Sequence, residues 1–369
     1  MKRFISLNTT AKKLLFCLVL LVSLIGISFF AWIYLSTLQV EEVESATFVN
    51  LTNAPMLESG QNLKVLSWNI QFLAGNKNNN FFFDGGEDSW PSISRRQQVL
   101  EQIAEIIIAE NPDVVLLQEV DEGAKRTGHA DQLAALLNLL PKEYRNHSSA
   151  FYWKADFVPH PSVMGSVGMK LSTISKYQIT EATRYALTSI QSQSWIMQQM
   201  NPKRAILEIQ LPITNSGTLN VMNTHLSAFA QSDNTMEIQV KQVMGLITKK
   251  QAQGHDNIII GGDFNLLSSS FAYNLLDTKG KSYYNPSGTE LSPILEVLGS
   301  IPSIELINGK DYADWFTHSP NHISGASPDR TIDYLFYTNA LTLVGQKVRS
   351  NDTLLISDHL PVIGIFRIP

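Results

Sequence analysis

The sequence has very little cysteine, because Cys17 is the single one in 369 residues. A single cysteine excludes an internal disulfide and any zinc site built from cysteine ligands. Cys17 lies within an apolar run and follows Phe16, where a lipidation site would favour a small residue. We therefore interpret Cys17 as a lipid-facing hydrophobic residue.

The sequence also lacks an excess of basic charge. It has 28 Lys and Arg residues against 33 Asp and Glu residues, which gives a net charge of −5 and a pI near 5.9. Such a chain has no general attraction to nucleic acid, although a local basic groove is still allowed. A hydrophobic content of 44% with 17% charged residues excludes an intrinsically disordered or collagen-like chain.

The longest apolar run covers residues 14–35, which contain no charged side chain. About 20 such residues are enough for a helix to cross the bilayer core. Basic residues precede the run and acidic residues follow it, at Lys2, Arg3, Lys12 and Lys13 and at Glu41, Glu42 and Glu44. The positive-inside rule then predicts a cytoplasmic N-terminus and an extracytoplasmic remainder.

These features predict a short cytoplasmic segment at 1–13, a transmembrane signal anchor at 14–38 and a juxtamembrane linker at 39–61. The alternative is a protein secreted after cleavage of a signal peptide, whose apolar region usually has only about 7 to 15 residues. No small-x-small cleavage site closely follows the run. We therefore expect a single-pass membrane protein.

Residues 62–369 are predicted to form one domain, because no linker, repeat or composition break interrupts them. Amphipathic periodicity predicts helices at 95–111 and 233–251. Apolar runs predict strands at 64–70, 114–118, 204–211, 219–225, 257–263, 332–338 and 362–368. Several successive strands lack a helix between them, which favours an α/β fold with two mixed β-sheets packed face to face and helices outside, a four-layer sandwich. Two segments, 76–90 and 145–165, are predicted to be long loops.

Polar side chains recur at or near the ends of the predicted strands, namely Asn69, Glu119, Asn223, His225, Asp263, Asn265, Asp333, Asp358 and His359. A carboxylate beside a buried strand is costly unless it is paired, hydrogen-bonded or bound to a metal. Each of these residues alone could be a loop acid, a turn residue or a capped surface histidine. Their recurrence in one pattern instead indicates a polar cluster, whose oxygen and imidazole donors suit Mg²⁺ or Mn²⁺ rather than structural zinc.

Six short motifs carry these residues in a fixed order, namely LSWNIQ, LQEV, NTHLSA, GGDFN, TIDYLFY and SDHLPV. In this order the motifs resemble the endonuclease/exonuclease/phosphatase superfamily, the deoxyribonuclease I-like metal-dependent phosphoesterases. The resemblance covers residues 62–369. It implies hydrolysis of a phosphoester and a fold of two packed mixed sheets flanked by helices, which agrees with the strand pattern.

The resemblance also implies a metal site. Glu119 resembles the principal metal carboxylate of the family, and Asn69 and Asp358 complete the metal and phosphate surroundings. Mg²⁺ or Mn²⁺ is the implied cofactor, and the number of ions stays open.

Catalytic roles follow from the same motifs. Asp263 resembles the acid that orients or deprotonates the attacking water, and Asn265 holds that water or a phosphate oxygen. His359 resembles the imidazole that faces the scissile phosphate, with Asp333 fixing its tautomer and favouring its charged form. His225 resembles a second phosphate-contacting histidine.

One further residue matches the family, and one segment matches it less closely. Arg204 in NPKRAILEI corresponds to an arginine often found there, and is either a phosphate contact or a partner in a structural salt bridge. The stretch at 165–179 is a weakened form of another family motif. Some nuclease members have an acidic residue near that stretch, and we assign it no counterpart here.

The resemblance implies the reaction more closely than the substrate, since family members act on DNA, RNA, sphingomyelin and inositol phosphates. A DNA-binding protein should neutralise several phosphates, whereas the basic residues here are scattered along the chain. The membrane anchor favours a lipid headgroup or lipid-linked phosphodiester, with residues 81–83 as a candidate interfacial loop. An exported nuclease and a non-catalytic binding module are the alternatives, and no obligate protein partner is evident.

Overall fold

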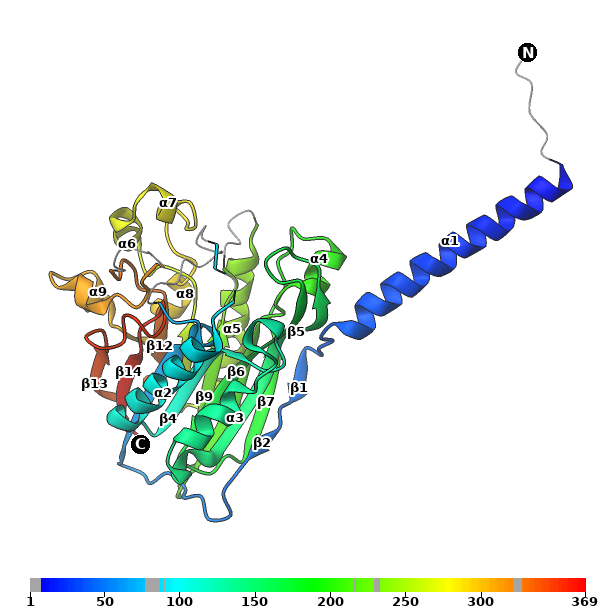
Figure 1. Ribbon diagram of the computed structural model, residues 1–369. Helices are drawn as coiled ribbons and strands as arrows, with labels where there is room; N and C mark the ends of the chain where they lie inside the picture. The colour runs from blue at the N-terminus through cyan, green and yellow to red at the C-terminus, as the bar shows by residue number, and fades with distance from the viewer. Residues whose placement is uncertain (1–7, 77–86, 89, 216, 229–232, 321–326) are drawn as a thin grey trace.

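A computed structural model describes residues 8–76, 87–88, 90–215, 217–228, 233–320 and 327–369. A long N-terminal helix, α1 (Thr9–Ser36), projects from a body built around two β-sheets (Figure 1). Within the described residues, the first sheet has seven strands in the order β13 (Thr342–Val348), β14 (Val362–Arg367), β3 (Asn62–Asn69), β4 (Val114–Asp121), β6 (Gly165–Ser175), β5 (Asn146–Val158) and β2 (Phe48–Val49). The second sheet, also of seven strands there, has the order β1 (Val43–Ser45), β7 (Glu181–Ala186), β8 (Ala205–Ile213), β9 (Gly217–His225), β10 (Ile258–Asp263), β12 (Asp333–Tyr337) and β11 (Gly299–Ile301).

Helices cover the outer faces of both sheets. The longer ones are α2 (Ile93–Glu110), α3 (Gln132–Leu139) and α5 (Thr235–Ala252). Short helices fill the connections, namely α4 (Trp195–Met200), α6 (Ser270–Leu275), α7 (Thr278–Lys281), α8 (Ser292–Leu295) and α9 (Ile304–Ile307). Each sheet is mixed, since β3 pairs with β4 and β9 with β10 in parallel, while their other neighbours are antiparallel.

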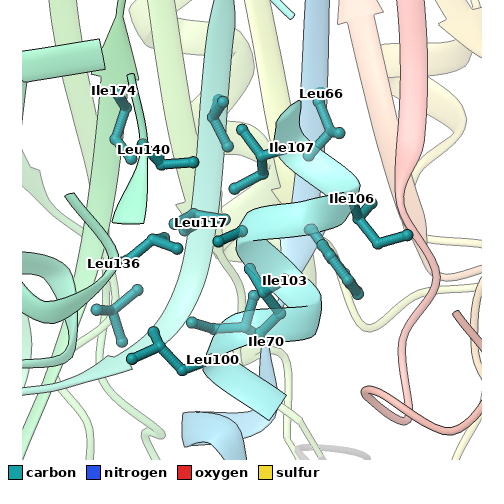
Figure 2. Packing of buried hydrophobic residues seen from close by; sticks show 14 of the residues in the cluster. Leu66, Ile70, Leu100, Ile103, Ile106, Ile107, Leu117, Leu136, Leu140 and Ile174 are labelled. Atoms are coloured by element: carbon teal, nitrogen blue, oxygen red, sulfur yellow. The ribbon is translucent and has the colours of Figure 1, made fainter. Parts of the chain in front are cut away.

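Helix α2 shows how the sequence produces one of these layers. The Ser92 hydroxyl caps its N-terminus by accepting the Arg95 N–H, and Asn111 ends it in a left-handed conformation. Ile103 and Ile107 recur at helical spacing and pack on Leu66 and Leu117 of the first sheet (Figure 2). Burial of each such side chain stabilises the fold by about 1.5–3 kcal/mol.

Strand alternation places the second core between the two sheets. On β3 and β4, Val65 and Leu116 face the second sheet and join the cluster of Val221 and Ile259. The outer face of the second sheet packs on α5 through residues such as Val243. The predicted four-layer sandwich of two mixed sheets between helices is therefore confirmed.

The structure differs from the sequence-based expectation in one segment and adds detail in two. The predicted loop at 145–165 is wrong, because residues 146–158 form the long strand β5, whose alternating burial is masked in the sequence by the polar Asn146 and Ser148 on its buried face and the partly exposed Phe151 on the other. Residues 39–61, expected as a linker, contribute the short edge strands β1 and β2. Most of the expected loop at 76–90, including residues 81–83, lies outside the described residues.

Candidate functional site

The two parallel strand pairs bring the predicted site residues to one end of the sandwich. In the second sheet, β10 lies between β9 and β12, so Asp263 is in register with His225 on one side and Asp333 on the other. In the first sheet, Asn69 at the end of β3 is in register with Gln118, which precedes Glu119. Residues far apart in the sequence therefore meet where these strands end.

Gly262 is required for this meeting. Its φ of +147° is unfavourable for a residue with a side chain, and a Cβ atom there would lie 1.8 Å from the carbonyl oxygen of Thr224. The glycine lets β10 lie close against β9 just before Asp263. The glycine before Asp263 in the GGD sequence is thus needed for strand packing, and the aspartate supplies the acid of the site.

His359 is held by a buried carboxylate. Its Nδ1 lies 2.8 Å from Oδ2 and 3.0 Å from Oδ1 of Asp333, which also accepts the Thr317 hydroxyl at 2.7 Å. A carboxylate only accepts hydrogen bonds, so Nδ1 donates and the other ring nitrogen, Nε2, is directed towards Asp263 at 3.6 Å. Burial alone would lower the pKa of His359, but the surrounding acids outweigh it and raise that pKa well above its usual value.

Asp263 is a buried acid without a Lys or Arg partner among the described residues. Its Oδ2 lies 3.1 Å from the Asn69 amide and 3.2 Å from Nε2 of His225. Burial raises its pKa to about 7, although the charge of His359 acts in the opposite direction. A carboxyl group with a pKa near neutrality can take up a proton at physiological pH, as a general base does.

His225 has a different character from His359. The Tyr152 hydroxyl lies 3.3 Å from its Nδ1, and the two rings meet edge to face. Burial, together with the charges of Arg204 and His359, lowers the pKa of His225 well below its usual value. The site therefore combines a charged and a neutral imidazole on either side of Asp263.

The first-sheet side of the site consists of oxygen donors. The Asn69 side-chain amide donates to Glu119 at 3.3 Å as well as to Asp263, while its oxygen accepts the backbone N–H of Gln71. The Gln71 side chain in turn donates to Asp358 at 2.8 Å. Asn69 thus bridges the two acids as a donor, and its role as a metal ligand stays a prediction.

Several of these residues have left-handed backbones. The φ angles are +48° for Gln71, +57° for Glu119 and +53° for Asn265, and Phe72 and Leu73 continue the left-handed turn after Gln71. Each such residue costs about 1–2 kcal/mol when it is not glycine. Strain of this kind gathers at functional sites, where the surrounding fold holds a side chain in a required position.

Several oxygen donors of the site are of the type that suits a hard divalent cation, although Glu119 is in neither of the described groups of acidic and histidine ligand atoms that lie within 4.8 Å of one another. Glu119 and Asp358 both line the same pocket. The side-chain oxygen of Gln71 is buried and, among the described residues, has no hydrogen-bond partner. Two carboxylates and an amide oxygen without a partner are the ligand types that Mg²⁺ and Mn²⁺ prefer.

A second group of potential ligand atoms comprises Asp263, Asp333 and His359, all buried and within 4.8 Å of one another. The Nδ1 atom of His359 is already engaged by Asp333, so this group is better described as a hydrogen-bonded imidazole–carboxylate pair beside a second acid. His318, whose ring lies 4.8 Å from that of His359, belongs to a third group with Asp358.

The site opens into a pocket of about 370 Å³. Arg204 lines it, and its Nη1 atom is buried without a hydrogen-bond partner in the described part of the chain. Its guanidinium lies 5.2 Å from the Tyr152 ring, and no salt bridge to it is found among the described residues. The salt bridge that was one of the two explanations for Arg204 therefore has no partner in the described part of the chain.

Most of the sequence-predicted site residues line this pocket, namely Glu119, Arg204, His225, Asp263, Asn265, Asp358 and His359, and Asn69 and Asp333 bond to residues that do. Asn223 does not line it, because its buried side chain bonds to Gln118 and to backbone oxygens between the sheets. Sequence reasoning missed Gln71, Tyr152, Thr317 and His318. Gln71 ends the LSWNIQ motif and could have been found there. The other three stand in segments without a recognisable motif.

Comparison with known proteins agrees with this geometry. The model of the endonuclease/exonuclease/phosphatase family matches residues 66–359, so the chain belongs to this family, whose members are phosphoesterases and nucleases that use divalent metals. No curated protein sequence matches the chain.

Solved structures resemble the chain at the level of the fold. An endonuclease/exonuclease/phosphatase from Beutenbergia cavernae is 21% identical, with a TM-score of 0.52 over 83% of this chain and 72% of that one. TDP2 from Caenorhabditis elegans is 17% identical, with a TM-score of 0.51 over 84% and 75% of the two chains. The human Nocturnin catalytic domain is 18% identical, with a TM-score of 0.50 over 87% and 96%.

Proposed function

We propose that the chain is a membrane-anchored, divalent-metal-dependent phosphoesterase that hydrolyses a phosphodiester by in-line attack of an activated water. The observation that carries the proposal is the meeting of Asp263, His225 and His359 in one pocket with an Arg204 nitrogen that has no partner among the described residues. Phosphodiester hydrolysis needs a base, hydrogen-bond donors and positive charge at one point.

In this mechanism Asp263 accepts the proton of the attacking water, which Asn265 helps to orient. The imidazolium of His359, held by Asp333, donates a hydrogen bond to a phosphate oxygen as negative charge develops there. Preorganisation by Asp333 means that the ring needs no reorientation during the reaction.

The phosphate is bound by the other polar groups of the pocket. Arg204 and His225 contact its non-bridging oxygens. Glu119 and Asp358, with Asn69 nearby and the Gln71 side-chain oxygen as an added ligand, would hold Mg²⁺ or Mn²⁺, and the ion would supply positive charge to neutralise the phosphate and the leaving alkoxide.

A lipid headgroup or lipid-linked phosphodiester is favoured as substrate over DNA or RNA. Arg126 and Arg204 are the basic Lys or Arg side chains among the described residues that line the pocket. Arg126 is already paired with Asp121, at 2.9 Å for each of two hydrogen bonds. A nuclease would be expected to offer several basic side chains to a phosphate backbone.

The position of the catalytic domain follows from the helix α1, which is long and apolar enough to cross a membrane. Its Ile33 is buried in a cluster with Trp153 and Met200 of the domain, a contact that favours a retained anchor over a cleaved signal peptide. The charge pattern favours a cytoplasmic N-terminus with the domain outside.

The test is hydrolysis by the purified full chain with Mg²⁺ or with EDTA. The panel comprises bis-p-nitrophenyl phosphate, supercoiled DNA, RNA, and vesicles of sphingomyelin or of inositol phospholipids. Metal-dependent cleavage of a lipid and not of DNA is the expected result, whereas DNA nicking would support the exported nuclease. A chain that binds Mg²⁺ but cleaves none of these substrates would support the non-catalytic binding module.

A further inference from the structure

The connection between β7 and β8 is an unusual surface segment. We call residues Leu187 to Pro202 of this connection the α4 segment, and none of them carries a charge. Within it, the helix α4 exposes Trp195, Ile196 and Met197, which are 44%, 37% and 50% exposed. Three consecutive large apolar side chains on a surface indicate an interaction site.

Helix α4 lies beside the end of α1 (Figure 1). The ring of Trp195 lies 5.8 Å from that of Phe30, and the Gln199 side chain accepts the Thr37 hydroxyl at 3.1 Å. Lys203 donates to Gln199 and to the backbone oxygen of Leu38. The last turn of α1 and the α4 segment are therefore joined by both apolar and polar contacts.

These contacts set the depth of α4 relative to a membrane crossed by α1. Phe30 lies five residues before Leu35, the last residue of the apolar run, which corresponds to about 7.5 Å along a helix. Trp195 beside Phe30 would then lie at the level of the lipid headgroups and upper acyl chains. Tryptophan is enriched at this level, where its ring is apolar and its N–H can meet water.

The same segment also forms part of the pocket. Ile190, Gln193, Asn201 and Pro202 line it. The apolar wall of the pocket, with Trp153, Met169 and Phe72, belongs to the same packed cluster as Ile33 of α1 and Met200 of α4. The pocket is therefore apolar towards α1 and polar towards Asp263.

We propose that α4 and the last turns of α1 form one bilayer-contact surface, and that the site takes its phosphodiester from a lipid held in that bilayer. The contact is apolar rather than electrostatic, because the α4 segment has no charge with which to attract anionic headgroups. The phosphate of the lipid would face Asp263 while its apolar part follows the wall formed by Trp153 and Met169. The inference on the substrate rests on the proposed phosphodiesterase activity, whereas the contact surface does not.

The surface is tested by the depth of a label on α4. The full chain carrying Cys17→Ser and Met197→Cys is labelled with an environment-sensitive fluorophore and placed in phosphatidylcholine nanodiscs that contain lipids spin-labelled near the headgroup. The control carries Ile108→Cys on α2, where the native side chain is 45% exposed. We expect quenching at residue 197 at least about twofold above the control, as interfacial burial predicts. Equal quenching at the two positions would overturn the surface.

The lipid substrate is tested by rates on two substrates. The double variant Ile196→Ser with Met197→Ser should hydrolyse the lipid cleaved by the wild type at least about fivefold more slowly, because two apolar interfacial contacts are lost. Its rate on bis-p-nitrophenyl phosphate should be unchanged, and Ile108→Ser should affect neither rate. An unchanged rate of lipid hydrolysis in the double variant overturns the inference that the site takes its phosphodiester from a lipid held in the bilayer. A wild type inactive on both substrates contradicts the proposed function instead, while the label still tests the surface.

Discussion

Two buried acids of this chain, Glu110 and Asp263, have opposite surroundings. Glu110, at the end of α2, accepts hydrogen bonds from Lys347 and Arg349 at 2.8 Å each. Burial would raise the pKa of Glu110, but these two cations outweigh it and lower the pKa. Asp263 has amide and imidazole neighbours and other acids nearby, and burial raises its pKa to about 7.

The comparison separates a structural acid, Glu110, from Asp263, the acid that we propose as the base. A buried carboxylate matched by cations contributes to stability, and its charge is fixed over the physiological pH range. A buried carboxylate that lacks such partners is a cost to folding, and a protein retains it where proton transfer needs it. Substitution of the two acids should therefore affect different properties of the protein.

The largest expected effect is on turnover when Asp263 is changed. Asp263→Asn should lower kcat by at least about 10², because the base acts mainly in the transition state. The free energy of unfolding should be unchanged or raised, since burial of this carboxylate without a Lys or Arg partner is a cost to folding. Asp256→Asn, at the exposed start of the same strand region, is the control and should affect neither quantity.

His359→Gln should lower kcat by about 10² as well, because the charged donor facing the phosphate is lost. Thr317→Val, which removes a hydrogen bond to Asp333, should have a smaller effect in the same direction. Steady-state kinetics on bis-p-nitrophenyl phosphate measure both. A wild-type kcat in His359→Gln would remove this residue from the mechanism.

Glu119→Gln should act on the metal rather than on the proton-transfer groups. We expect the Mg²⁺ concentration for half-maximal activity to rise at least about tenfold, with a parallel loss of Mn²⁺ affinity measured by electron paramagnetic resonance. Glu105→Gln, an exposed acid on α2, is the control. An unchanged Mn²⁺ affinity would exclude Glu119 as a ligand.

Glu110→Gln should lower the free energy of unfolding by about 1–2 kcal/mol with little effect on kcat, because charged hydrogen bonds are weakened far from the pocket. Denaturant unfolding of the detergent-solubilised chain measures this loss, with Glu105→Gln again as the control. A large loss of turnover at unchanged stability would reverse the assignment of Glu110 as structural.

The smallest expected effect is the pH dependence of the difference in free energy of unfolding between the wild type and Glu110→Gln. The pKa of Glu110 is lower in the folded chain than the unfolded value of about 4.3. Its contribution is therefore fully present above that value and is lost as the pH falls through the folded pKa. The difference in free energy of unfolding between the wild type and Glu110→Gln should therefore be constant from about pH 6 to 8. It should decrease as the pH falls below the unfolded pKa. A difference that instead widens in acid would contradict the lowered pKa.

Much of the fold follows from sequence patterns alone. Apolar runs that end in a polar residue, as at Asn69 and Asp263, predict both the strands and the edge at which they meet. Strand β5 could not be predicted, because the polar Asn146 and Ser148 lie on its buried face and the apolar Phe151 lies on the other face. A half-buried strand is recognised by alternation of apolar and polar residues, and here that alternation is broken.

The site was predictable where a residue is part of a motif and not where only tertiary packing brings it in. Asp333 and His359 both belong to motifs that are recognisable in the sequence, and they meet although Asp333 begins β12 and His359 lies before β14. Tyr152 bonds to His225 and Thr317 bonds to Asp333, and each pair comes from different elements of the fold. No spacing in the sequence therefore predicts these two residues. The left-handed turn at Gln71 is likewise set by the packing around it.

The most direct measurement is hydrolysis of bis-p-nitrophenyl phosphate by the full chain and by Asp263→Asn, each with Mg²⁺ and with EDTA, together with their unfolding curves. The account predicts metal-dependent turnover by the wild type, a loss of at least about 10² in the variant, and unfolding at the same or higher denaturant concentration. Equal turnover by the two folded proteins, or turnover that EDTA leaves unchanged, would contradict it.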